Sequence, residues 1–199
     1  MTLPLVKEAL MASKVSIANL ALTILGADRI TALEDNNENA RRLTAIYDAC
    51  LEDVLRAHPW NFAIKRQALA RLTTTPAFGY DYEFQLPGDC LRPIEANDGT
   101  NIITSYAIEG RKLLTDEDAI NIKFISNITD PNQYTAQFIM VLSARLASEL
   151  AYAITNNKAN AELIMSIYME RLQVAKETDA QESDSVAVID DDLWTIEKR

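Results

Sequence analysis

The hydrophobic pattern of residues 37–72 changes its period once, at a proline. In its first half, apolar residues recur at intervals of three and four, the period of an amphipathic helix; they are Ala40, Leu43, Ile46, Tyr47, Cys50, Leu51, Val54 and Leu55. The helical pattern stops at His58 and Pro59, because proline lacks the amide donor for the next helical hydrogen bond and favours an extended residue before it. After Trp60, residues 62–69 have a strand-like pattern. His58, Pro59 and Trp60 are therefore predicted to form a structural hinge between a helical part and a β part.

Three further segments have a helical period. One covers residues 3–25, with a break near Ser13, and the short polar connector after it predicts antiparallel packing against the second helix. The third helix is expected over residues 131–154, with Asp130 as its N-cap and proline at its first position. The fourth is expected over residues 160–178.

Between these helices, residues 61–130 have the pattern of strands. Apolar and polar side chains alternate with a period of two, which is typical of a half-buried strand; the apolar members of the clearest run are Tyr80, Tyr82, Phe84 and Leu86. Residue types that favour turns follow at residues 87–89, 97–100 and 109–112. We expect antiparallel strands joined by short loops.

The predicted fold class is α+β. Two helices before the strands and two after them are expected to form one four-helix bundle. An antiparallel β-sheet of four or five strands is inserted in this bundle, and an extended acidic C-terminal arm follows it. Residues 1–60 and 131–180 are assigned to the helical bundle, residues 61–130 to a β-rich platform, and residues 181–199 to the arm.

The end of the chain combines an acidic run with an apolar tip. Residues 177–192 carry seven Asp or Glu and no Lys or Arg, which disfavours compact packing. Leu193, Trp194 and Ile196 follow, and burying the ring of Trp194 would contribute about 2–3 kcal/mol. We expect this tip to be a docking element, either folded back on its own domain or seated on a neighbouring subunit or partner.

Composition excludes several function classes. A net charge of −10 and a pI near 4.6 argue against a general nucleic-acid-binding surface, because phosphate binding relies on Lys and Arg. One His and two cysteines without metal-ligand spacing argue against a zinc site, and five Gly are too few for a phosphate-binding fingerprint. No run approaches the ~20 apolar residues of a membrane span. We therefore predict no enzymatic activity, no cofactor, no metal and no membrane association, with Cys50 and Cys90 as buried thiols.

Two charged positions have alternative explanations. Arg41 and Arg42 lie on the polar side of the second helix, where they form either a solvated face or an inter-subunit contact with an acidic partner. His58 is the single histidine and so the one side chain whose ordinary pKa lies near neutrality. Its position beside Pro59 favours a role in packing or capping.

Several blocks of sequence occur in a characteristic order: ILG and ITAL at residues 24–33, NARR followed by HPWNFA at residues 39–63, YEFQLPGDCLR at residues 82–92, EGRKLLTD at residues 109–116, and the Leu- and Ala-rich segment at residues 138–154. In this order and spacing they resemble the tail tubular protein A family of short-tailed bacteriophages, whose members are head-to-tail adaptor (connector) proteins. Each block is a packing or turn motif, so the resemblance rests on their succession.

The resemblance implies a virion structural protein that is assembled in the host cytoplasm. Members of the family form a dodecameric ring below the portal protein, extend the DNA channel and present a platform to the tail nozzle protein. Their helices face the portal, their sheet faces the tail, and a C-terminal segment reaches towards the portal. A ring of this kind uses heterologous contacts between copies. An acidic lumen would let DNA pass without specific binding.

A stand-alone acidic binding or regulatory module is the competing hypothesis. In that case the helical bundle presents a groove to a partner, and the acidic arm mimics nucleic acid. A monomer that binds a basic protein in the absence of a portal would favour this second function.

Overall fold

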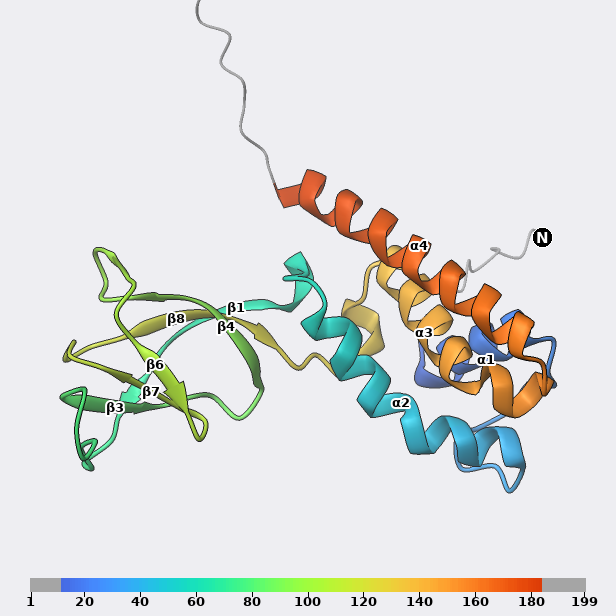
Figure 1. The fold of residues 1–199 in the computed structure, drawn as a ribbon, viewed down its shortest axis with the longest axis horizontal. Coiled ribbons are helices and arrows are strands. Elements are labelled where there is room, and N and C mark those ends of the chain that lie inside the picture. Colours follow the sequence, from blue (N-terminus) through green and yellow to red (C-terminus); the bar gives the residue numbers. More distant parts are fainter. Residues whose placement is uncertain (1–11, 184–199) are drawn as a thin grey trace, which may run out of the picture.

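The computed structural model describes residues 12–183, which form four α-helices and eight strands. Figure 1 shows an elongated molecule with the helices at one end and the strands at the other. The predicted mixed α+β class is confirmed. The helices are α1 (Lys14–Leu25), α2 (Glu38–Arg56), α3 (Ala136–Thr155) and α4 (Lys158–Ser183).

The first helix begins at a reciprocal cap. Ser13 Oγ accepts a hydrogen bond from the Ser16 amide at 3.0 Å, and Ser16 Oγ accepts one from the Ser13 amide at 2.9 Å. This capping box satisfies two amides that would otherwise lack partners, so α1 starts anew after Ser13. The described part of the chain thus has a helix boundary at Ser13, where the break was predicted. The part of the predicted helix at residues 3–11 lies outside the described residues.

The second helix stops where the sequence predicted and begins at an asparagine cap. Asn37 Oδ1 accepts a hydrogen bond from the Ala40 amide at 2.8 Å, and the helix stops at Arg56, before His58 and Pro59.

The start of α3 differs from the prediction. Asp130 caps a short 3₁₀ helix, Pro131–Gln133 (η2), and Thr135 caps α3 itself. Tyr134 separates the two because its backbone is extended, with φ −79° and ψ 140°. Its hydroxyl donates to the Ile128 carbonyl at 2.8 Å, and its ring packs 4.9 Å from the ring of Phe138. Burial of this aromatic side chain outweighs continuation of the helix.

The helical half is built around α3, which packs against α1, α2 and α4. Small side chains allow the close approach, and they are fully buried: Ala144, Ala147 and Ala151. By length and composition, α3 is the one helix in the described part of the chain that could cross a membrane. Half of that apolar window is buried inside the protein, so packing against three helices accounts for its composition.

The strands form two sheets, so the prediction of one sheet with four or five strands is wrong. Within residues 12–183, one antiparallel sheet has the order β1-β8-β4-β5 and the other has the order β2-β3-β7-β6. The strands are β1 (Ile64–Ala68), β2 (Ala70–Arg71), β3 (Tyr82–Gln85), β4 (Cys90–Asn97), β5 (Ile102–Ile103), β6 (Ala107–Glu109), β7 (Lys112–Thr115) and β8 (Asn121–Ser126).

Two separate cores result, and β8 belongs to both. Ile122 and Phe124 on β8 pack with Phe84 and Leu113 of the other sheet, so the two sheets enclose one core. Ile125, the next residue along β8, points the opposite way and joins the core of the helices. Because successive side chains of a strand alternate in direction, a single strand connects the two cores.

The β6–β7 hairpin has the predicted tip. Gly110 and Arg111 both have positive φ, 52° and 63°, which two-residue hairpin loops of type I′ require. The Arg111 guanidinium donates to the Pro87 carbonyl at 2.7 Å and so ties this turn to the loop before β4.

Candidate functional site

The predicted hinge forms the corner between the two halves. Trp60 is fully buried, and its indole nitrogen donates to the Val54 carbonyl of α2 at 2.8 Å. Its ring meets the edges of two neighbours, His58 at a centroid distance of 5.0 Å and Phe138 of α3 at 5.3 Å. Phe62 packs against Phe138 as well, at 4.9 Å. Aromatic side chains from the corner and from the start of α3 thus form one packed group.

Asp179 of α4 fastens the end of that helix to the same corner. It is only 5% exposed, and both of its carboxylate oxygens accept hydrogen bonds from the Asn61 amide at 3.2 Å. His58 Nε2 lies 3.1 Å from Asp179 Oδ2, and Asn61 Nδ2 donates to the Asp179 carbonyl at 2.7 Å. We refer to His58, Asn61 and Asp179 as the corner clasp.

Asp179 was not singled out by the sequence pattern, because it falls within the acidic run of residues 177–192. A signal was nevertheless present. Asp179 continues the buried stripe of α4 at helical spacing, after Leu172 and Ala175. An acidic residue on an apolar stripe indicates a buried partner.

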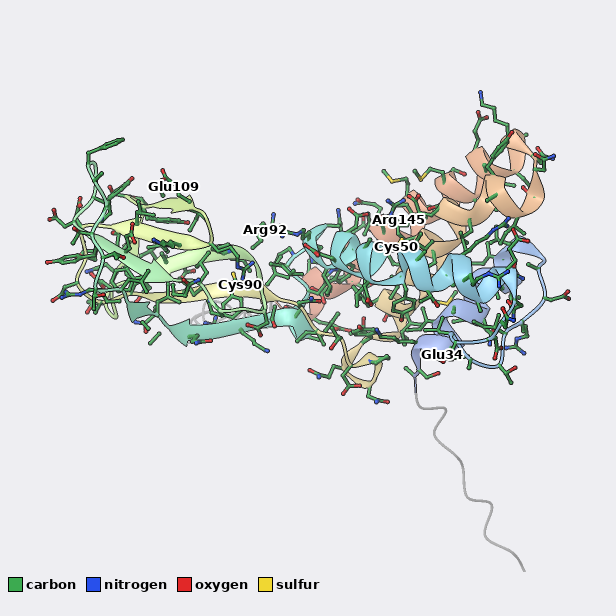
Figure 2. The ribbon with its side chains drawn as sticks, turned by 90° about the horizontal axis from the view of Figure 1, so that it is seen from below. Glu34, Cys50, Cys90, Arg92, Glu109 and Arg145 are labelled. Carbon is green, nitrogen blue, oxygen red and sulfur yellow. The ribbon has the colours of Figure 1, made fainter. Side chains whose placement is uncertain are left out.

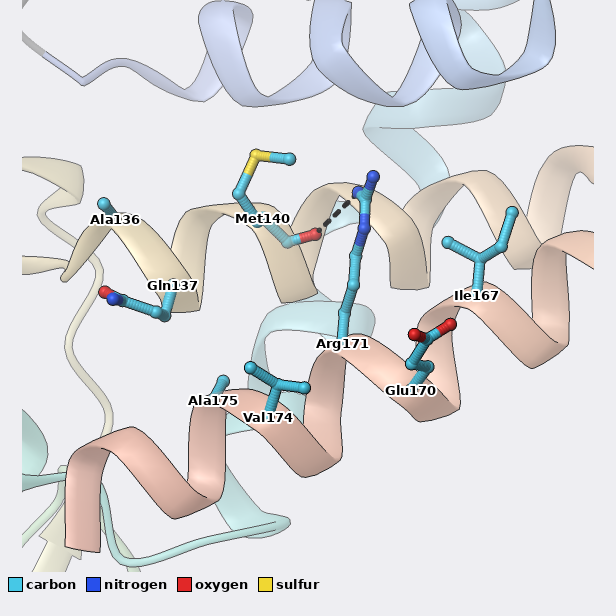
Figure 3. Close-up of a pocket in the computed structure, with 8 residues that line it drawn as sticks. All are labelled: Ala136, Gln137, Met140, Ile167, Glu170, Arg171, Val174 and Ala175. Carbon is cyan, nitrogen blue, oxygen red and sulfur yellow. Dashed lines mark hydrogen bonds between the residues drawn. The ribbon is translucent and has the colours of Figure 1, made fainter. Parts of the chain in front are cut away.

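A second feature of the helical half is a groove between α3 and α4 (Figure 3), with a volume of about 610 Å³. Met140 of α3 and Val174 of α4 line it and remain 41% and 54% exposed. The Arg171 guanidinium donates to the Met140 carbonyl at 3.4 Å across the groove. The remaining lining residues are Ala136, Gln137, Ile167, Glu170 and Ala175.

Arg41 and Arg42 have partners within the chain. Arg41 donates to Asn36 Oδ1 at 2.8 Å. Arg42 donates to the Ala153 carbonyl at 2.9 Å and pairs with Glu38, so it joins the start of α2 to the end of α3. Their role as an inter-subunit contact stays a prediction. The docking residues Leu193, Trp194 and Ile196 lie outside the described residues.

The charged centre of the helical half is Arg145 of α3. Its guanidinium pairs with Asp53 of α2 at 2.9 Å and with Glu149, and it lies 5.4 Å from the centroid of the Tyr168 ring of α4. These contacts cross-link three helices. Burial alone would lower the pKa of Arg145, but Glu149 and Asp53 together outweigh it and raise the pKa, so this cation is a permanent structural charge.

The two thiols do not form a reactive site. Figure 2 shows Cys50 in the helical half and Cys90 in the strand half, and both are buried and free. Burial raises the pKa of Cys50 to about 11 and also raises the pKa of Cys90. Since the thiolate is the nucleophile, both side chains are inert at neutral pH. Residues 12–183 contain no group of three or more His, Cys, Asp or Glu side chains arranged to hold a metal ion.

One carboxylate in the strand half is also strongly held. Asp89 Oδ2 accepts hydrogen bonds from Lys65 Nζ and Ser126 Oγ, each at 2.8 Å. The bond from Lys65, followed by that from Ser126, lowers the pKa of Asp89 against the effect of burial. The charge fastens β1 and β8 to the start of β4, which is a structural task.

The sequence matches no family model and no curated protein.

Proposed function

We propose that the protein is a structural head-to-tail adaptor of a short-tailed bacteriophage. Copies would form a dodecameric ring between the portal protein and the tail nozzle protein and would extend the DNA channel of the virion. The observation that supports this function best is the corner. It joins two separately packed halves through a buried tryptophan and a buried carboxylate, as a spacer between two different partners requires.

In this proposal the four helices act as one bundle and face the portal, while the two sheets face the tail. The acidic arm extends from the end of α4, and the corner clasp fixes the direction in which α4 ends. Arg41 and Arg42 are exposed or half-buried at the start of α2 and contribute to contacts between neighbouring copies. The net charge of −10 keeps DNA from adhering as it passes.

Deleting residues 193–199 is expected to weaken binding to the portal ring while leaving the fold intact. Loss of the buried Trp194 ring removes about 2–3 kcal/mol, which corresponds to a roughly 30- to 150-fold higher dissociation constant. Binding to purified portal rings, measured by interferometry, tests this, with Thr195→Ala in the full chain as the matched control. Equal affinity of the deleted and the full chain would show that the arm does not dock on the portal.

A further inference from the structure

The groove between α3 and α4 leaves apolar side chains in contact with solvent. Met140 and Val174 line the groove and are about half exposed, and Figure 3 shows Val174 projecting from α4 toward α3. Ile167 and two alanines extend the same apolar lining. A hollow of this size that lies on the main core and is lined mostly by carbon marks a surface that another segment covers.

The chain before α1 starts from this part of the molecule. α1 and α3 run in the same direction: beyond the end of α1, Asp28 accepts a hydrogen bond from Asn39, and nearby Arg42 reaches Ala153 at the end of α3. α1 has 12 residues and α3 has 20, so α1 begins about two turns further along than α3 does. In Figure 3 the chain enters α1 above the end of the groove where Ala136 lies.

Residues 3–11 have the composition of a cover for this groove. Six of the nine are apolar, and Leu3, Val6 and Leu10 recur at helical spacing. The capping box at Ser13 marks the N-terminal end of α1. Nine residues of helix are about 13 Å long, which matches the span of about 12 Å from Ile167 to Ala175 on α4.

The charged residues of this segment are also complementary to those that line the groove. The polar residues of this segment are Lys7 and Glu8, an adjacent pair of opposite sign. The groove offers Glu170 and Arg171, also adjacent and opposite in sign. A segment lying along α4 can therefore pair both of its charges while its apolar residues fill the groove.

We propose that residues 3–11 of the same chain dock in the α3–α4 groove and complete the core of the helical half. The segment supplies Leu3, Val6 and Leu10 to the surface formed by Met140, Ile167 and Val174. It acts as a fifth helical layer that closes this face before any partner binds.

Thiol labelling of Val174→Cys tests this inference. The native cysteines are buried and serve as a constant slow background. Deletion of residues 2–11 is expected to speed the reaction of Cys at position 174 with a maleimide by at least about tenfold, since opening of the cover then no longer limits access. Met169→Cys is the matched control: Met169 is 57% exposed but lies on the opposite side of α4, so its rate should not change.

A second variant avoids dependence on a deletion. Val6→Asp together with Leu10→Asp keeps the chain length and should produce the same acceleration, with circular dichroism to verify the helices. Equal labelling of position 174 in all chains would overturn the inference. Faster labelling only after deletion of residues 184–199 would also overturn it, because the C-terminal arm would then be the occupant of the groove. Protection of position 174 that depends on protein concentration would overturn it as well, because the occupant would then be a second copy of the chain.

Discussion

Replacing Trp60 with Ala is expected to lower the free energy of unfolding by about 3–5 kcal/mol. The side chain is completely buried between α2, α3 and the short helix Asn61–Ala63 (η1), and its removal leaves a cavity that the surrounding aromatic rings cannot fill. The Val54 carbonyl also loses its indole donor. Urea unfolding followed by circular dichroism measures the change.

The control for this prediction is Trp60→Phe. This variant keeps an aromatic ring against Phe138 but removes the hydrogen bond to Val54, so we expect a smaller loss of about 1–2 kcal/mol. If Trp60→Ala cost well under 1 kcal/mol, the corner would not be the rigid joint described above.

The second large effect is expected for Asp179→Ala, at about 2–3 kcal/mol. The substitution leaves the Asn61 amide without an acceptor in a place that water reaches poorly, and it removes the partner of His58. The last turns of α4 should then separate from the corner. Hydrogen exchange of residues 176–183 is expected to accelerate more than exchange in α3.

Glu182→Ala provides the matched control, because this residue lies on the same helix and is exposed. Its effect should stay within about 0.5 kcal/mol. Equal effects of the two substitutions would mean that the clasp does not hold α4 and that helix charge alone matters.

The sequence predicted the helices well where local signals coincide. At α2, the apolar stripe and the Pro59 stop indicate the same segment, and the structure has that helix. At α3, the Asp130-Pro131 signal was real but belonged to a shorter 3₁₀ helix. Packing of the Tyr134 ring, a tertiary effect, decided where α3 begins.

The alternation of apolar and polar residues could not predict which strands pair. Alternation predicted that Phe84 faces a core, but it does not show which strands are neighbours. The separation into two sheets depends on the passage from β1 to β2, where the Leu69 amide bonds to the Ile120 carbonyl. Contacts between residues far apart in the chain, such as that between Asn61 and Asp179, are likewise absent from local periodicity.

The sequence predicted one of the two candidate surfaces, the corner, but not the other, the groove between α3 and α4. The corner residues were predicted because a proline and a tryptophan interrupt a regular helix. The groove was not, since Met140 and Val174 resemble ordinary members of apolar helices until their neighbours are known. Leu193 and Trp194 stay predictions from composition alone.

The most direct test of the proposed adaptor function is the mass of the complex that this protein is expected to form with a portal ring. Light scattering coupled to size exclusion should show a complex with about twelve copies bound to each ring, as a closed ring of heterologous contacts on a portal requires. Persistent elution of the two proteins apart, with a monomer that instead binds a basic protein, would contradict the proposal and favour a stand-alone binding module.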